Sequence, residues 1–364
     1  MKMKRSTKTM AALCLCAGLA LPLFGCSTKG TTSSATSKVS SAVSSTVSKM
    51  TTLTDTAGNR VKVPQRISHI ADAATGHAAT LMVLGAGSKV VAATNDAKNT
   101  PLALKMNSAF NTALTTTART FDATALKAKK PDVYFATADD PAAKAVQKTG
   151  VPVVAVGFKN FDQMGKAVTT TATALGGDAP ARAKAFNSYT QSTVNNVKST
   201  TSQIPENEKL RVLHLSSTDP IKVDGGDTIV DEWIKDAGGV NAAQGVTGDA
   251  KEVSLDQVKS WNPDVIIIGN TGEDGAKKIR EDSNWAGIKA VQTGKVYNNP
   301  VGTYAWDRYT PESVLQVQWA AKTLYPDRFT SLDMNQAVKD YYKKFMNYDI
   351  SDADVQTVLN PQKA

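Results

Sequence analysis

The chain holds few side chains that could perform catalysis. Its three histidines are His69, His77 and His214, and it contains no Gly-x-Ser-x-Gly elbow, His-Glu-x-x-His helix, P-loop or Cys-x-x-Cys pair. The segment Gly85-Ala86-Gly87 lacks the third glycine of a dinucleotide-binding loop. Two of the histidines, His69 and His214, fall within predicted strands, which favours packing in the core. We therefore expect no enzyme activity.

His77 is the histidine best placed to meet a ligand. It follows Gly76 and lies between the first predicted parallel strand (67–71) and the start of a helix. In open α/β sheets the carboxyl ends of the strands face the binding crevice. The sequence leaves two alternatives open for His77, a ligand contact and a packed core residue.

Cys26 indicates a different kind of chemistry. Four basic residues precede an apolar run (10–24), and the small residue Gly25 stands directly before the cysteine. This order is typical of a secretory signal, and the run is shorter than the ~20 residues that span a bilayer. A cysteine at this point resembles a bacterial lipobox. We expect residues 1–25 to be a signal peptide and Cys26 to carry a lipid; the alternative is an ordinary signal with a chance cysteine.

The composition predicts a globular chain of two lobes after that signal. The formal charge of +9 includes four basic residues in the first 25, which contain no acid, so the remainder carries +5. Basic and acidic residues are interspersed, which argues against a nucleic-acid surface. The other two cysteines, Cys14 and Cys16, lie in the signal, so no disulfide is expected. Roughly 300 residues remain, which is more than one ordinary domain.

Strands and helices alternate in the predicted N-terminal lobe (51–178). The segment before it, 26–50, is rich in Ser and Thr and lacks large apolar residues, so we expect a flexible tether. A hairpin follows, with its turn at Ala57-Gly58-Asn59. The alternation predicts a largely parallel sheet covered by helices. The expected strands are 67–71, 90–93, 133–136 and 151–156, and the expected helices 78–84, 124–129, 142–148 and 161–175.

One long helix is predicted between two such lobes. Residues 179–203 contain no strand signal and no interior glycine, and a helix of that length spans about 35 Å. The predicted linking helix is 179–204 and the C-terminal lobe, with C-terminal helices, is 205–364. A Pro-Asp turn before a buried strand occurs in both lobes, at 131–132 and 263–264. In the second lobe we expect strands at 212–216, 265–269 and 295–298, and helices at 228–237, 255–261 and 311–324.

Thirteen short motifs occur in order along the chain: 55–58, 66–67, 84–91, 219–221, 225–226, 228–232, 237–241, 261–266, 284–291, 294–297, 304–308, 311–313 and 325–329. Together they resemble the iron-siderophore, haem and vitamin B12 class (class III, with a helical backbone) of substrate-binding proteins of ABC transporters. The resemblance extends from Thr51 to about Asn347. It implies an α/β fold of two Rossmann-like lobes joined by a single long helix, with the ligand cleft between the lobes.

The resemblance also implies partners and a location. The expected partners are an ABC permease with its ATPase, a small metal chelate as ligand, and a membrane reached through the lipid anchor. We expect a monomer with no cofactor, resident metal or nucleic acid, at the outer face of a Gram-positive membrane rather than in a periplasm. Many members carry a first-lobe glutamate that docks with the permease, but the segment 75–80 has none. Glu312 is the second-lobe docking candidate; alternatively, it complements the dipole of its helix.

The expected ligand contacts come from both lobes. Tyr304, Trp306 and Arg308 lie on a loop between a strand and the helix that starts at Pro311. Aromatic faces and a forked guanidinium suit a chelate that is flat in parts and often anionic. The alternative is that Trp306 packs locally and Arg308 pairs with Asp307. Phe158 and Lys159 are the matching first-lobe candidates. Tyr304 and His77 could also ligate haem iron from opposite lobes.

The sequence thus favours a ferric siderophore as the ligand and leaves other choices open. Cobalamin, haem or a molybdate-type oxyanion would serve the same role. A sensor or adhesion lipoprotein without transport, or an extracytoplasmic enzyme on the same scaffold, are alternatives of a different class.

Overall fold

The computed structural model describes residues 49–94, 96–116, 121–269 and 274–361. The predicted signal peptide, Cys26 and nearly all of the predicted tether lie outside these ranges. Within them, no helix has the length and apolar character that crossing a bilayer requires. The chain divides into two units, Met1–Thr46 and Val47–Ala364, and the second unit is described below.

An antiparallel hairpin begins this unit, as predicted. Strand β1 (Met50–Thr54) pairs with β2 (Arg60–Pro64). Asp55 stabilises the turn because its Oδ1 accepts hydrogen bonds from the backbone N–H groups of Ala57 and Asn59. Its Oδ2 accepts from the N–H of Ala155, so the same carboxylate attaches the hairpin to the first lobe.

The first lobe is built on five parallel strands in the order β5-β4-β3-β6-β7. Strand β6 is buried along its whole length, as expected for a parallel sheet covered on both faces. The edge strand β5 was not predicted, because its three residues are only partly buried and show no apolar run. The strands are β3 (Ile70–Asp72), β4 (Val90–Thr94), β5 (Leu114–Thr116), β6 (Val133–Ala136) and β7 (Val153–Ala155); the helices are α1 (His77–Val83), α2 (Asp96–Asn99), α3 (Pro101–Met106), α4 (Ala109–Thr112), α5 (Ala123–Ala128), α6 (Ala143–Lys148) and α7 (Phe161–Leu175).

The second lobe has a mixed sheet in the order β11-β9-β8-β12-β13, with β10 pairing with the start of β8. Strands β8, β12 and β13 are parallel, whereas β9 and β11 are antiparallel additions at one edge. These additions are too short to show a hydrophobic period, so the sequence did not predict them. The strands are β8 (Arg211–Thr218), β9 (Ile221–Val223), β10 (Val240–Asn241), β11 (Lys251–Glu252), β12 (Val265–Ile268) and β13 (Val296–Asn298); the helices are α9 (Ile229–Asp236), α10 (Leu255–Trp261), α11 (Gly275–Glu281), α12 (Lys289–Gln292), α13 (Ser313–Leu324), α14 (Met334–Met346) and α15 (Asp352–Leu359).

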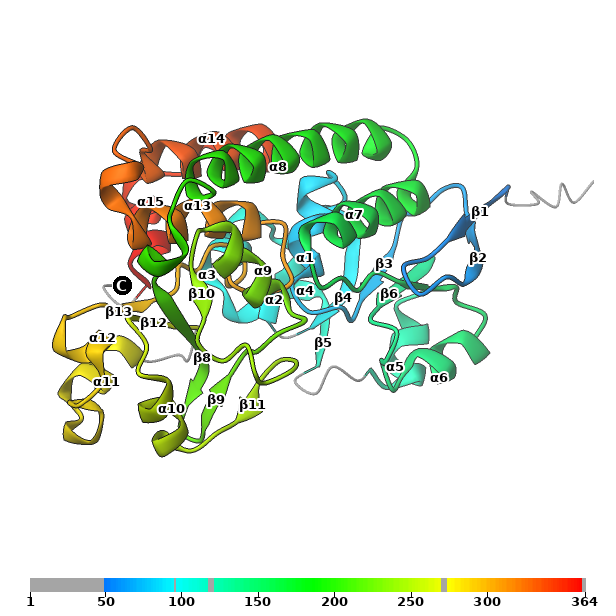
Figure 1. The fold of residues 1–364 in the computed structure, drawn as a ribbon. Coiled ribbons are helices and arrows are strands. Elements are labelled where there is room, and N and C mark those ends of the chain that lie inside the picture. Colours follow the sequence, from blue (N-terminus) through cyan, green and yellow to red (C-terminus); the bar gives the residue numbers. More distant parts are fainter. Residues whose placement is uncertain (1–48, 95, 117–120, 270–273, 362–364) are drawn as a thin grey trace, which may run out of the picture. The chain divides into compact units, whose positions relative to one another are not determined.

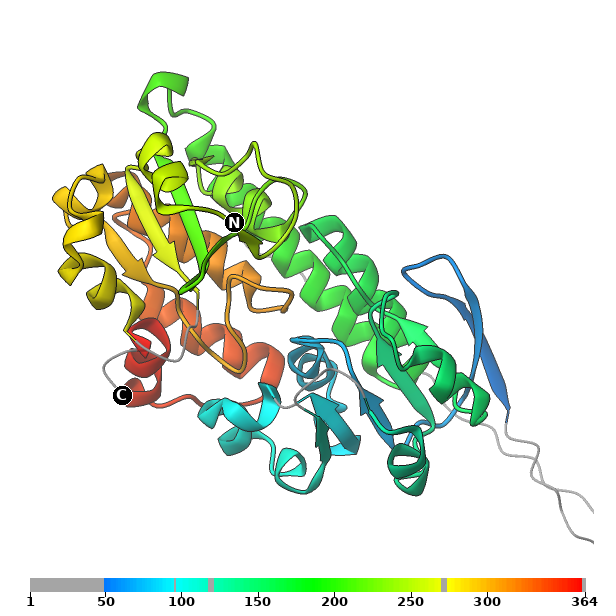
Figure 2. The same ribbon diagram turned by 90° about the horizontal axis from the view of Figure 1, so that it is seen from below.

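Helix α8 (Ala179–Thr201) joins the lobes, which confirms the predicted architecture (Figures 1 and 2). It packs against α7 of the first lobe and α13 of the second. Its Phe186 and Tyr189 rings lie 5.4 and 4.9 Å from the ring of Phe345 on α14. One continuous apolar core includes Ile70 of the first sheet and Trp233 on α9. Because this core is shared, we expect the lobes to resist large relative movements.

The repeated Pro-Asp turn has a structural explanation. Asp132 Oδ2 accepts hydrogen bonds from the N–H groups of Ser68 and His69, at 2.7 and 2.9 Å. Asp264 Oδ2 accepts from the N–H of Arg211 at 2.8 Å. Each aspartate therefore attaches the start of one strand to the start of its neighbour in the sheet. His69 lies in this exposed connection, so the prediction that it packs in the core is wrong; His214 is fully buried, as predicted.

Candidate functional site

A cavity of about 1280 Å³ opens between the two sheets. Many of the first-lobe residues that line it follow β3, β6 and β7. The second-lobe residues include Ser216 and Ser217 near the end of β8, Gly269 directly after β12, and residues on the loop after β13. Figure 2 shows that loop (orange) between the two sheets. The cavity therefore lies at the carboxyl ends of parallel strands in both lobes, where open α/β sheets bind their ligands.

The lining of this cavity is polar and balanced in charge. Three cationic side chains (Lys159, Lys222 and Arg308) face three carboxylates (Asp139, Asp227 and Asp249). The aromatic rings come from Phe158, Tyr304 and Tyr309, and the hydroxyl and amide groups from Thr56, Thr75, Asn99, Thr100, Thr137, Gln163, Ser216 and Ser217. Such a lining offers apolar faces together with both hydrogen-bond donors and acceptors.

Five of the six predicted ligand residues line this cavity, namely Tyr304, Arg308, Phe158, Lys159 and His77. Two of them also connect the lobes. The Phe158 ring meets the Tyr309 ring edge-on with centroids 5.7 Å apart, and Lys159 Nζ lies 2.6 Å from Asp227 Oδ2.

The lobes also meet at Gly76, which has a φ of 75°. A Cβ atom at that position would lie 2.5 Å from the backbone oxygen of Tyr309 in the other lobe. Both the left-handed conformation and the close approach therefore require glycine. This contact limits how much further the lobes can close beside Tyr304.

His77 reaches the cavity wall but is 5% exposed. Its Nδ1 lies 3.0 Å from Asp72 Oδ1, and its Nε2 lies 2.9 Å from Thr171 Oγ1. Because both ring nitrogens already have partners, this arrangement leaves none free to ligate haem iron. The expectation of a haem ligand at this position is corrected.

Trp306 does not line the cavity. It is fully buried, its backbone N–H donates to the backbone oxygen of Pro300, and its backbone oxygen accepts from Ser313 Oγ. Along the loop, Tyr304 and Arg308 face the cavity while Trp306 between them turns into the core. The expectation of a tryptophan at the rim is therefore wrong.

Glu312 is fully buried as well, so the prediction that it docks with a permease is wrong. Its carboxylate accepts hydrogen bonds from the N–H and hydroxyl of Thr303, the N–H of Tyr304 and the hydroxyl of Tyr342. Burial raises the pKa of this carboxyl, and the hydrogen bonds offset that only in part. Glu312 holds the loop that presents Tyr304 to the cavity.

A buried network of charges supports Arg308. His214 lies between two carboxylates, with Nδ1 2.7 Å from Asp224 Oδ2 and Nε2 2.7 Å from Asp307 Oδ2. Arg308 Nη1 donates to Asp224 Oδ1 at 3.0 Å. Burial by itself lowers the pKa of His214, but the hydrogen bonds and charges of both aspartates raise it overall. Sequence analysis offered a pairing of Arg308 with Asp307 as an alternative but missed Asp224 and His214, which lie far from Arg308 in the chain.

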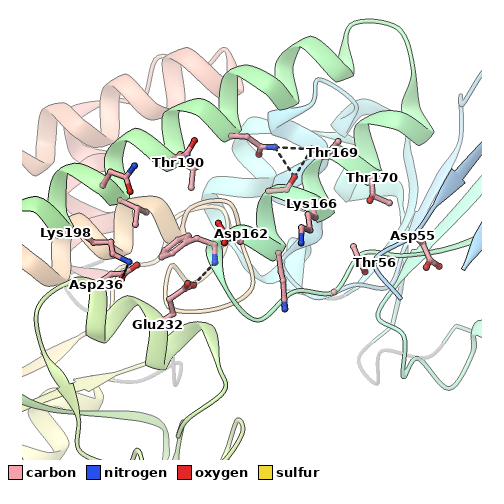
Figure 3. A pocket seen from close by; sticks show the side chains of 18 of the residues that line it. Asp55, Thr56, Asp162, Lys166, Thr169, Thr170, Thr190, Lys198, Glu232 and Asp236 are labelled. Atoms are coloured by element: carbon pink, nitrogen blue, oxygen red, sulfur yellow. Dashed lines mark hydrogen bonds and ion pairs between the residues drawn. The ribbon is translucent and has the colours of Figure 1, made fainter. Parts of the chain in front are cut away.

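A second cavity of about 900 Å³ is bordered by α7, α8 and α9 (Figure 3). Glu232 Oε2 accepts a hydrogen bond from the N–H of Phe161 at 2.6 Å, which joins α9 to the start of α7. Lys198 Nζ lies 2.8 Å from Asp236 Oδ1. Burial is the largest cause that raises the pKa of Glu232, and the nearby charge of Asp236 raises it further; the hydrogen bond from Phe161 lowers it by a smaller amount. The net result is a pKa of about 7. Most of its lining lies on helices α7, α8 and α9, and only Thr54, Asp55, Thr56 and Gly157 come from strand ends or the residues after them, so the first cavity remains the candidate site.

No metal centre is evident in the described ranges, because no three His, Cys, Asp or Glu side chains there are arranged to hold an ion. The network around His214 accordingly consists of ion pairs and hydrogen bonds.

Comparisons with known proteins agree with this architecture. The molybdate-binding protein MolA of Haemophilus influenzae is 40% identical over 110 residues, which are 30% of this chain and 31% of MolA. The match thus spans about a third of that relative. A periplasmic solute binding protein from Veillonella parvula superposes with a TM-score of 0.75 and 25% identity, over 85% of this chain and 97% of that one. Molybdate-bound MolA superposes with a TM-score of 0.75 and 23% identity, over 83% and 99%.

A family model described as periplasmic binding protein matches residues 70–300, which include most of both sheets and the linking helix. Proteins of this family are solute-binding proteins, which confirms the expectation that the chain is not an enzyme. The chain belongs to the periplasmic binding protein family.

Proposed function

We propose that this chain is the substrate-binding protein of an ABC importer and that its ligand is a metal chelate, in the first place a ferric siderophore. The cavity between the lobes carries this proposal. Its volume of about 1280 Å³ lies above the usual ~300–1,000 Å³ of small-molecule sites, so it suits a bulky ligand. Aromatic faces from both lobes and a balanced set of charges suit a chelate with apolar and polar parts.

The family implies an extracytoplasmic location, and the remaining features are proposals. We propose that Cys26 is lipidated after removal of residues 1–25 and that the protein is anchored to the outer face of a Gram-positive membrane as a monomer. A permease with its ATPase would receive the ligand. The buried position of Glu312 means that docking uses other residues.

Calorimetric titration of the full chain in detergent tests the proposed ligand. The ligands are a ferric hydroxamate, a ferric catecholate, haem, cobalamin and molybdate. We expect saturable binding of a ferric chelate, weakened at least about 10-fold by Tyr304→Ala, because the lost ring supplies buried apolar area. Tyr348→Ala is the matched control, since Tyr348 is partly buried but is not a lining residue. Absence of binding to every compound would favour a sensor lipoprotein.

A molybdate-type oxyanion is the second candidate, and two observations favour it. The 110-residue match is to a molybdate-binding protein, and hydroxyl and amide groups are numerous in the cavity lining. Binding of molybdate without binding of any chelate would replace the first proposal with this one.

A further inference from the structure

Asp249 presents an unusual acceptor at the second-lobe end of the cavity. Its Oδ2 accepts a hydrogen bond from the hydroxyl of Tyr309, whereas its Oδ1 is buried and has no hydrogen-bond partner in the described chain. That Oδ1 lies 3.9 Å from Arg308 Nη1. Because all three side chains line the cavity, the carboxylate stands beside the cation that a ligand anion would seek.

The loop that carries Asp249 is firmly held. The N–H of Gly225 donates to the oxygen of Gly248 at 3.0 Å, and the N–H of Ala250 donates to Asp224 Oδ1 at 2.8 Å. A Cβ atom at Gly225 would lie 1.9 Å from the backbone oxygen of Val246, so glycine is required for this close approach. Asp249 therefore occupies a defined place in the wall.

The charges around Arg308 do not leave it open to an anion. Its guanidinium is hydrogen-bonded to Asp224, and its Nε lies 3.8 Å from Asp307 Oδ2. Counting the imidazolium of His214 with Arg308 against Asp224, Asp249 and Asp307, the cluster carries a formal charge of −1. An anion that approaches this wall meets a net negative group at close range.

We propose that Asp249 sets the charge preference of the cavity by serving as the internal counter-ion of Arg308. Its side chain is 38% exposed and lines the cavity, so its negative charge favours a ligand that presents a positive group or a hydrogen-bond donor at this point. The same charge disfavours simple dianions and strongly anionic chelates.

This inference rests on the proposed function and names the ligand class more closely. Ferric hydroxamates are neutral or cationic and carry amide or ammonium donors, whereas ferric tricatecholates are trianionic and molybdate is a dianion. The charge at Asp249 therefore favours a ferric hydroxamate over either of the other two.

Calorimetric titration of the full chain and its Asp249→Asn variant with three probes tests the inference. The probes are ferrioxamine B, which is cationic, a ferric tricatecholate and molybdate. We expect the wild type to bind ferrioxamine B most tightly. In Asp249→Asn we expect about 10-fold weaker binding of ferrioxamine B and about 10-fold tighter binding of the anions, as one unit charge at short range predicts.

Two variants serve as controls. Asp249→Glu keeps the charge and should keep the wild-type order of affinities. Asp256→Asn removes an exposed carboxylate on α10 that does not line the cavity, so affinities should change less than about 3-fold. Circular dichroism of each variant checks its fold.

The outcomes separate this inference from the proposed function. Binding of a chelate with the same order of affinities in wild type and Asp249→Asn would overturn the role of Asp249 alone. Binding of molybdate by Asp249→Asn, with no chelate bound by either protein, would support that role and overturn the proposed ligand. Absence of binding by both proteins to all three probes would overturn both.

Discussion

Each lobe contains one buried histidine, and the two differ in position and in their partners: His77 begins α1, whereas His214 lies within β8. His77 lies between one carboxylate, Asp72, and the hydroxyl of Thr171. His214 lies between two carboxylates, Asp224 and Asp307. Each ring also contacts an aromatic side chain, Phe135 or Trp233, with centroids 5.0 and 6.0 Å apart.

The second hydrogen-bond partner of each histidine sets the charge near the cavity wall of its lobe. A hydroxyl beside His77 completes a local polar cluster and adds no further charge. A second carboxylate beside His214 holds the imidazolium in place and brings a second acid near Arg308. The described first-lobe lining therefore contains no arginine, whereas the second-lobe lining includes Arg308, which belongs to a buried ionic network.

Removing the second-lobe histidine should have the largest effect. In His214→Gln, two buried aspartates lose their shared cation, and unpairing buried charges costs about 3–5 kcal/mol of unfolding free energy. Urea unfolding at neutral pH measures the loss. A destabilisation below about 1 kcal/mol would show that the network is not held by the imidazolium.

The pH dependence of the wild-type protein's stability should reflect this role of His214. Because the folded-state pKa of His214 is raised, its contribution to stability is complete below the unfolded pKa and is lost as pH rises through the folded value. His214→Gln should lack that loss.

Replacing the first-lobe histidine should destabilise the protein less. In His77→Gln, an amide can replace part of the hydrogen bonding to Asp72 and Thr171, so we expect a loss of about 1–3 kcal/mol. Unfolding under the same conditions as for His214→Gln gives the comparison directly. Equal losses in the two variants would mean that the second carboxylate adds nothing.

The contact between the lobes at Glu232 should depend on pH. Its pKa is raised from 4.5 to about 7, so the folded state binds the proton more tightly than the unfolded chain. Stability from this group is therefore complete below pH 4.5 and is lost as pH rises from 4.5 to about 7. Partial exposure reduces the effect to about 1–2 kcal/mol.

Glu232→Gln tests this expectation, since its amide oxygen can still accept from the N–H of Phe161. Unfolding free energies measured between pH 4.5 and pH 7 should fall for the wild type and change less for the variant. Parallel pH profiles would assign the dependence to other groups.

The exposed pair between the lobes should contribute least. Lys159 and Asp227 are 57% and 64% exposed, so we expect Asp227→Asn to cost less than about 1 kcal/mol. Thermal unfolding at low and high salt measures this pair. A larger loss that persists at high salt would indicate that the pair holds the lobes together.

Local sequence patterns predicted most of the fold. The long helix α8 was located to within three residues and strand β6 at its observed bounds, because uninterrupted helical and buried β patterns depend on neighbours in the chain. The cavity position of Tyr304 and Arg308 also followed from a loop between a strand and a helix. Strands β9 and β11 were missed because two or three residues show no period.

The sequence by itself therefore determined the α/β alternation, the linking helix and the scarcity of catalytic groups. Only the tertiary structure decided that Trp306 and Glu312 are buried and that Asp224, Asp249 and Asp307 gather around Arg308. Hydrophobic periods are set by residues three or four positions apart. A buried charge is set by side chains up to 93 residues apart, such as His214 and Asp307, which meet only when two loops and a sheet are in place.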